Sequence, residues 1–256
     1  MKIQYASDLH LEFADNWRYL KENPLKVTGD VLVLAGDIGY LGDENYSKHP
    51  FWDWASENYQ QVICCMGNHE FYKYFDIATL EDGYCLEIRH NVHSYYNAVV
   101  RIGGTDFIIS TLWSEIPLRD AFYTERVISD FRRILFNGEL LTFADFNREH
   151  RRCLEFIKKA IEGSTAENKI VVTHHVPSFL MQCPKFEGSL ANGAFTVELK
   201  DYIKDSDIDF WIFGHSHYNV DKVIGQTACL SNQLGYVFHN EHTGFDHGKH
   251  IMLSES

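Results

Sequence analysis

Residues 30–37 are Asp-Val-Leu-Val-Leu-Ala-Gly-Asp, a short run of apolar side chains that ends abruptly in a glycine and an aspartate. Lys2–Ala6 and Gln61–Met66 are similar runs, and a polar turn follows each of them. Apolar runs of this length are typical of strands that are buried on both faces of a parallel sheet. Ser47–Tyr59, between two of these strands, gathers its large apolar residues on one side, as a helix would. This alternation predicts a βαβ arrangement, with a strand at Asp30–Ala35.

The rest of the chain combines further crossovers with hairpins. Gly103-Gly104 and Gly225-Gln226 each separate two apolar runs, which is a hairpin signal. The mixture favours an α/β fold in which two sheets pack face to face with helices outside. Because we find no repeat and no low-complexity linker, we expect one domain over residues 1–256. The remaining predicted elements are strands at Val99–Ile102, Thr105–Ser110, Lys169–Thr173, Asp209–Phe213, Asn219–Ile224 and Thr227–Leu230, helices at Ala144–Ile161 and Phe195–Ile203, and a loop with some helix at Leu118–Leu141.

Composition and charge exclude several classes of protein. Acidic residues outnumber basic ones by 36 to 23, which gives a formal net charge of −13. This charge disfavours nucleic acid as a partner, because phosphate backbones need a basic face. No apolar run approaches the length of a membrane span, and Asp8, His10 and Glu12 interrupt the N-terminal segment where a signal peptide would be apolar. The 6 cysteines form no Cys-x-x-Cys pair, so we expect reduced thiols in a cytoplasmic protein.

Residues that bind metals follow the predicted strands directly. The carboxyl ends of strands form the ligand-binding edge of an open α/β sheet. Aspartate, asparagine and histidine suit Mn²⁺, Fe or Zn²⁺, with positions left open for water and substrate. One such motif is weak evidence, whereas an ordered set at successive strand ends is strong evidence for a common metal site. The set is Asp8-Leu9-His10, Gly36-Asp37, Gly67-Asn68-His69-Glu70, His174-His175 and Gly214-His215-Ser216-His217.

This ordered set resembles the motifs of the calcineurin-like metallophosphoesterase superfamily, and it spans most of the chain. The small single-domain bacterial and phage-type members are the most similar. The resemblance implies a four-layer α/β/β/α sandwich of two mixed sheets with flanking helices, a two-metal centre and hydrolysis of phosphoesters. The stretches that carry this closer resemblance are MKIQYASDLHLEF (1–13), GNHEFY (67–72), TLWSE (111–115), VVTHHVPS (171–178) and Asn232-Gln233-Leu234-Gly235-Tyr236.

The resemblance also implies a role for each motif residue. Asp37 would bridge the two ions, which we expect to be Mn²⁺ and/or Fe, although Zn²⁺ also suits the ligands. His174 is favoured over His175 because it comes first after the strand. A hydroxide between the ions would attack phosphorus, His69 would protonate the leaving group, and Glu70 would orient His69 or act as a structural hydrogen-bonder. The first ion would be held by Asp8, His10, Asp37 and His217, and the second by Asp37, Asn68, His174 and His215.

The chain departs from the superfamily pattern at two places. Protein phosphatases of the superfamily carry an arginine soon after the Gly-Asp motif, but residues 38–42 are Ile-Gly-Tyr-Leu-Gly. Residues 232–236 also lack the arginine that relatives often have there. The first departure disfavours a phosphoprotein substrate, and the second removes another possible contact to an anion. We expect Phe71–Tyr96 and Trp113–Phe143 to select the substrate, with rings that either stack a base or pack the loops onto the core. The arginines that could replace the missing ones are Arg119, Arg126, Arg132 and Arg133.

The expected function is hydrolysis of a small or nucleotide-like phosphodiester. A phosphomonoesterase with the same metal centre is the alternative. A third hypothesis is a protein-binding scaffold without catalytic activity, because some superfamily members have become such subunits. Scaffolds of this kind typically lose metal ligands, whereas every expected ligand and His69 are present here. We therefore expect an enzyme whose partner is a small phosphoester and not a membrane.

Overall fold

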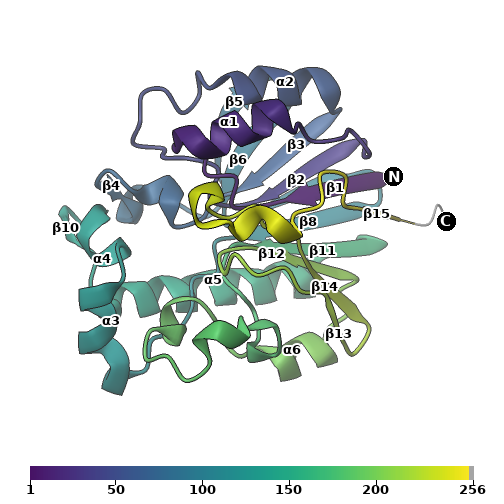
Figure 1. Ribbon diagram of the computed structural model, residues 1–256. Coiled ribbons are helices and arrows are strands. Elements are labelled where there is room, and N and C mark those ends of the chain that lie inside the picture. The colour runs from purple at the N-terminus through teal and green to yellow at the C-terminus, as the bar shows by residue number, and fades with distance from the viewer. Residues whose placement is uncertain (254–256) are drawn as a thin grey trace.

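Two six-stranded sheets form the centre of the computed structural model, which describes residues 1–253 (Figure 1). In each sheet the four central strands are parallel, and an antiparallel strand closes each edge. In spatial order the first sheet contains β15 (His250–Met252), β1 (Lys2–Ala6), β2 (Val31–Ala35), β3 (Gln61–Cys65), β6 (Val92–Tyr96) and β5 (Tyr84–Arg89). The second contains β13 (Lys222–Ile224), β14 (Thr227–Ser231), β12 (Phe210–Phe213), β11 (Asn168–Thr173), β8 (Thr105–Ser110) and β7 (Ala98–Ile102).

Alternating side chains of these strands build the layers. Val31 and Val33 of β2 point between the sheets, where they pack with Ile170 and Val172 of β11. The intervening Leu32 of β2 points outward. Because both faces of the central strands are covered, β2 is apolar throughout, as the sequence indicates.

Helices cover the outer face of each sheet. On the first sheet these are α1 (Ala14–Glu22) and α2 (Pro50–Asn58), and on the second α5 (Phe143–Gly163) and α6 (Lys200–Asp205). Thr142 caps α5 in a capping box with Asp145. The predicted four-layer α/β/β/α sandwich is confirmed. Among the described residues, no helix combines the length and the apolarity that a membrane span requires.

The segment between β8 and α5 is more ordered than expected. It contains α3 (Ala121–Val127) and α4 (Asp130–Arg133), and a small third sheet joins β10 (Glu139–Leu140), β9 (Ile134–Phe136) and β4 (Phe75–Asp76). This segment projects from one end of the two large sheets (Figure 1). Its short elements have too little local periodicity to be predicted, because they are stabilised mainly by packing.

The predicted helix Phe195–Ile203 is wrong for its first half. Residues 196–198 instead run alongside the segment after β11, where Thr196 forms a bridge with Val176. The backbone of Val197 donates to Val176, and that of Leu199 donates to Pro177, so this stretch is paired like an edge strand. The tertiary pairing outweighs the helical spacing of its apolar residues. The predicted helix at Ser47–Tyr59 exists but begins later, at Pro50, where His49 caps it.

Candidate metal centre

The predicted site residues come together at the carboxyl ends of β1, β2, β3, β11 and β12. The backbone is left-handed at five of them, which is unusual for residues other than glycine. Such conformations persist only where the surrounding structure enforces them, and they concentrate at functional sites. These five residues are Asp8, His10, Asp37, His215 and His217, with φ between 47° and 74°.

The loops can approach one another because two motif residues have no side chain. A Cβ atom at Gly67 would lie 2.3 Å from Oδ1 of Asp37, and one at Gly214 would lie 2.7 Å from Oδ2 of Asp8. Both distances are far below a van der Waals contact, so any larger residue would displace a carboxylate. The glycines of these motifs are therefore required by close approach.

A first group of possible ligands consists of Asp8, His10 and His217. Nε2 of His217 lies 3.3 Å from Oδ1 of Asp8 and 3.1 Å from Nε2 of His10. The outward ring nitrogens are held by carboxylates: Nδ1 of His10 lies 3.0 Å from Glu12, and Nδ1 of His217 lies 2.5 Å from Glu241. Such contacts orient the rings and leave both Nε2 atoms facing the centre.

A second group consists of Asp37, His174 and His215. Nδ1 of His174 donates to the carbonyl of Ala35, which turns Nε2 toward Oδ1 of Asp37 at 3.2 Å and Oδ1 of Asn68 at 3.0 Å. Nε2 of His215 faces the carbonyl oxygen of Ala194 at 3.2 Å, which leaves Nδ1 as its nitrogen for a metal.

Asp37 belongs to the second group and also to a third, which it forms with His10 and His69. Its Oδ1 faces His174, whereas its Oδ2 lies 3.8 Å from Nε2 of His10. His175 points elsewhere: its Nδ1 faces the carbonyl of Thr111, and its ring packs near Trp113. The geometry therefore brings together Asp8, His10, Asp37, Asn68, His174, His215 and His217, and it leaves His175 outside the set.

The electrostatics of this cluster suit divalent cations. Burial opposes a positive charge on the rings of His174 and His217. The Asp37 carboxylate nevertheless raises the pKa of His174 to about 9. Hydrogen bonds to Asp8 and Glu241 raise the pKa of His217 to about 10. The buried carboxylates are thus stabilised by nearby positive charge, which the protonated histidines supply when no metal is bound. A buried set of carboxylate oxygens, imidazole nitrogens and one amide oxygen fits Mn²⁺, Fe or Zn²⁺.

Glu70 connects two of the loops through their backbones. Its fully buried carboxylate accepts from the backbone N–H groups of Asp37 at 2.9 Å, Ile38 at 2.7 Å, Gly39 at 3.3 Å and Gly67 at 2.7 Å. All four donors belong to the loops after β2 and β3. Of the two roles expected for Glu70, this arrangement is the structural one.

Glu12 makes the contact to His69 that Glu70 does not make. Nδ1 of His69 donates to Oε1 of Glu12 at 2.8 Å, and Nε2 lies 3.2 Å from the hydroxyl of Tyr236. Burial disfavours a charge on His69, but Asp37 and Glu12 raise its pKa above the ordinary value. Sequence reasoning did not assign Glu12 or Tyr236 a role, although both lie in stretches that carry the family resemblance.

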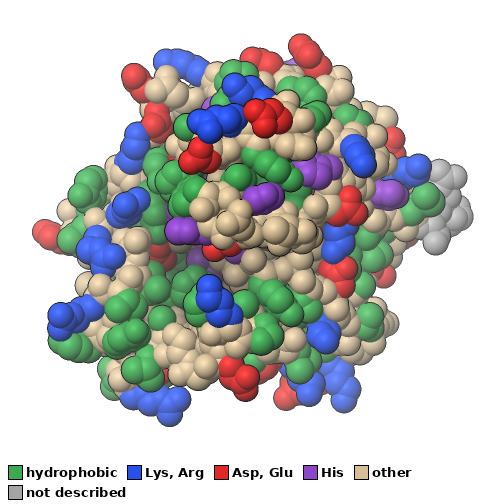
Figure 2. Space-filling view, in the orientation of Figure 1, with side chains coloured by type: hydrophobic (Ala, Val, Ile, Leu, Met, Phe, Trp, Pro, Cys, Tyr) green, Lys and Arg blue, Asp and Glu red, His purple; other side chains and the backbone are tan. Residues whose placement is uncertain are grey.

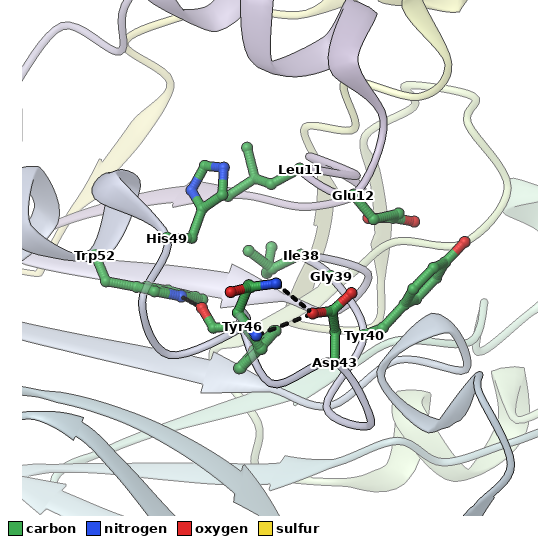
Figure 3. Close-up of a pocket in the computed structure, with 10 residues that line it drawn as sticks. Leu11, Glu12, Ile38, Gly39, Tyr40, Asp43, Tyr46, His49 and Trp52 are labelled. Atoms are coloured by element: carbon green, nitrogen blue, oxygen red, sulfur yellow. Dashed lines mark hydrogen bonds between the residues drawn. The ribbon is translucent and has the colours of Figure 1, made fainter.

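Glu12 also lines a small cavity. This cavity of about 130 Å³ lies beside the metal centre and is walled by Ile38, Tyr46 and Trp52 among others (Figure 3). The other carboxylate oxygen of Glu12, Oε2, is buried without a hydrogen-bond partner. Glu12 therefore separates the histidines of the centre from this largely apolar space.

A larger cavity of about 450 Å³ opens directly onto the metal centre. Its walls come from the loops around α4, from residues 182–196 and from the C-terminal loop with Tyr236 and Glu241. Histidine side chains gather across the middle of the molecular face in Figure 2. None of the residues that line this cavity, all of them within residues 1–253, is lysine or arginine.

None of the four middle-segment arginines lines this cavity, although Arg133 contacts one of its wall residues. Arg133 lies over the ring of Tyr72 at 5.2 Å, Arg126 lies over Phe122, and Arg132 donates to the backbone of Arg126. Most rings of the two variable stretches pack onto the core, as one of the two interpretations expects; Phe71, Tyr96 and Trp113 are completely buried.

A family model described as calcineurin-like phosphoesterase matches residues 1–219. The chain belongs to this family. As a calcineurin-like phosphoesterase, it is a metal-dependent enzyme that hydrolyses phosphoesters. An uncharacterised protein of Acanthamoeba polyphaga mimivirus is 28% identical over 261 residues, which cover 91% of each chain.

Among solved structures, the phosphopantetheinyl hydrolase of Mycobacterium tuberculosis is similar in fold, with a TM-score of 0.70. The superposition covers 99% of this chain and 96% of that one, at 13% sequence identity. At this identity the likeness concerns the fold alone. The likeness in fold continues beyond residue 219, where the family model ends, and covers the whole sandwich of this calcineurin-like phosphoesterase.

Proposed function

We propose that this chain hydrolyses a small phosphodiester at a two-metal centre in the cytoplasm. The observation that carries the proposal is the position of Asp37, whose Oδ1 faces His174 while its Oδ2 faces His10. The 6 free cysteines support the cytoplasmic location. We assign Asp8, His10, Asp37 and His217 to the first ion and Asp37, Asn68, His174 and His215 to the second.

The residues around the ions have separate tasks in this proposal. When bound, Mn²⁺ or Fe would supply the positive charge that binds phosphate oxygens and the acidity that generates a nucleophile from water near neutral pH. Protonated His69 then gives its Nε2 proton to the departing oxygen of the substrate. Glu12 holds Nδ1 of His69, which fixes the ring and favours its protonated form. General acids of this kind contribute about 10²–10⁴-fold to the rate.

The larger cavity favours a diester over a monoester. A phosphomonoester carries up to two negative charges. A substrate with a second phosphate group would need further cations, for which arginine is the usual partner. The cavity offers no cationic side chain and is lined by the additional carboxylates of Asp130 and Glu241. A diester has one negative charge and a second ester arm, and the volume of about 450 Å³ can accommodate that arm.

The test compares bis-p-nitrophenyl phosphate with p-nitrophenyl phosphate in the presence of Mn²⁺. We expect the higher kcat/KM for the diester. His69→Ala should lower kcat by about 10²–10⁴-fold and leave the metal content unchanged, whereas the exposed control His90→Ala should behave like the parent. A preference for the monoester would support the alternative phosphomonoesterase. Loss of metal in His69→Ala would instead make His69 a ligand and contradict its assigned role.

A further inference from the structure

Asp130 connects the middle segment to the metal centre. It is the first residue of α4 and is 1% exposed. Its Oδ1 accepts from the side-chain amide of Asn68 at 2.9 Å and from the hydroxyl of Tyr72 at 2.7 Å. Its other oxygen, Oδ2, is buried without a hydrogen-bond partner, and Asp130 is one of the residues that line the larger cavity.

This contact determines which way the amide of Asn68 points. A carboxylate oxygen only accepts hydrogen bonds, and Oδ1 of Asp130 would still accept if the proton sat on Oδ2. The amide must therefore present its NH₂ group to Asp130. Its oxygen then faces the opposite side, where it lies 3.0 Å from Nε2 of His174. A flipped amide would turn the NH₂ group of Asn68, which has no lone pair for a metal, toward the second ion.

We propose that Asp130 is a positioning residue that holds the amide oxygen of Asn68 toward the second metal ion. The proposal rests on the function proposed above, in which Asn68 is a ligand of that ion. Partners behind metal ligands commonly contribute about 10–100-fold to metal affinity or activity. Asn68 needs such a partner, because the oxygen and the nitrogen of its amide differ in chemistry but hardly in shape.

The experiment measures Mn²⁺ binding to the full chain by titration, with metal content determined by mass spectrometry. We expect Asp130→Ala to lower the affinity for one of the two Mn²⁺ ions by about 10–100-fold and to leave the affinity for the other unchanged. Asp130→Asn, whose amide oxygen can still accept from Asn68, should bind both ions nearly as the parent does. The control Asp120→Ala removes a buried carboxylate from the same segment that does not contact Asn68, and it should have no effect.

A double-mutant cycle separates positioning from a general loss of stability. If Asp130 acts only through Asn68, Asp130→Ala should not weaken Mn²⁺ binding further in an Asn68→Ala background. Additive effects in this cycle, equal losses in Asp130→Asn and Asp130→Ala, or full binding of both ions by Asp130→Ala would each overturn the inference. If Asp130→Ala does not fold, Asp130→Ser, which is too short to reach the amide, takes its place in the cycle. A parent protein that binds fewer than two ions would instead refute the proposed two-metal centre itself.

Discussion

Oε1 of Glu12 lies 2.8 Å from Nδ1 of His69 and 3.0 Å from Nδ1 of His10. One carboxylate oxygen thus holds both an expected metal ligand and the expected general acid. The two histidine rings meet edge to face, with 4.5 Å between their centroids. Because Glu12 is buried, its charge acts strongly on both rings, and His10 and His69 in turn lower the pKa of Glu12 to about 2 against the effect of burial.

Glu12→Gln should lower kcat and shift its dependence on pH. The charge of Glu12 raises the pKa of His69, so its removal lowers that pKa, and His69 loses its proton at a lower pH. The fall in kcat on the alkaline side should therefore begin at a lower pH than in the parent. The pH profile of bis-p-nitrophenyl phosphate hydrolysis checks this, with the exposed Glu44→Gln as control. An alkaline limb that stays in place would show that Glu12 does not tune His69.

Glu70→Gln should destabilise the fold. The parent carboxylate accepts four backbone hydrogen bonds, whereas glutamine offers one acceptor oxygen and a donor that faces other donors. Hydrogen bonds to charged groups contribute about 1.5–3 kcal/mol each, and we expect a total loss of about that size. Burial and Asp37 raise the pKa of Glu70 to about 7, so urea unfolding is measured at pH 8, where the carboxylate is charged.

The exposed Glu57→Gln is the matched control for this measurement, because it makes the same chemical change at the end of α2. Equal free energies of unfolding for the two variants would contradict a structural role for Glu70.

Without metal, the protein should lose stability as the pH rises. The pKa values of His174 and His217 are raised to about 9 and about 10, above about 6.5 in an unfolded chain. Their contribution to stability is fully present below about pH 6.5 and is lost as the pH rises through the folded values. Thermal melting in the presence of a chelator should show a falling Tm between these limits. His217→Asn should make the fall less steep, and a rising Tm in the parent would contradict the pKa assignment.

Mn²⁺ should bind more weakly in acid, because bound histidines must release their protons. The increase in Tm that Mn²⁺ causes should therefore be larger at pH 8 than at pH 6. An increase that is the same at both values would mean that the histidines of the centre are not ligands.

Gly67→Ala should weaken metal binding and activity, because its Cβ atom would lie 2.3 Å from Oδ1 of Asp37. Gly163→Ala is the control: it adds the same methyl group at the end of α5, where no atom lies within 4 Å. We expect the Mn²⁺ affinity of this control to equal that of the parent. Equal affinities for both variants would exclude the close approach of the two loops.

The sequence predicts the sheets and the convergence of the motif residues at one edge for a physical reason. Strands such as Val31–Ala35 are buried on both faces and are followed within two residues by a motif residue, here Asp37, so their composition and their motif reinforce each other. Glu12 carries no such signal, because it becomes a partner of His69 only when β1 and β3 lie in one sheet. Asp130 carries no such signal either, because it contacts Asn68, 62 residues away, only through the packing of the middle segment.

The most direct test of the account is the metal content of the parent protein and of Asp37→Asn, measured with the rate of bis-p-nitrophenyl phosphate hydrolysis. We expect two Mn²⁺ ions per parent chain, close enough to couple magnetically. The account also predicts that the substitution, which removes the charge of the shared carboxylate, abolishes the coupling and most of the activity. An Asp37→Asn protein that is as active and as fully loaded with metal as its parent would contradict the account.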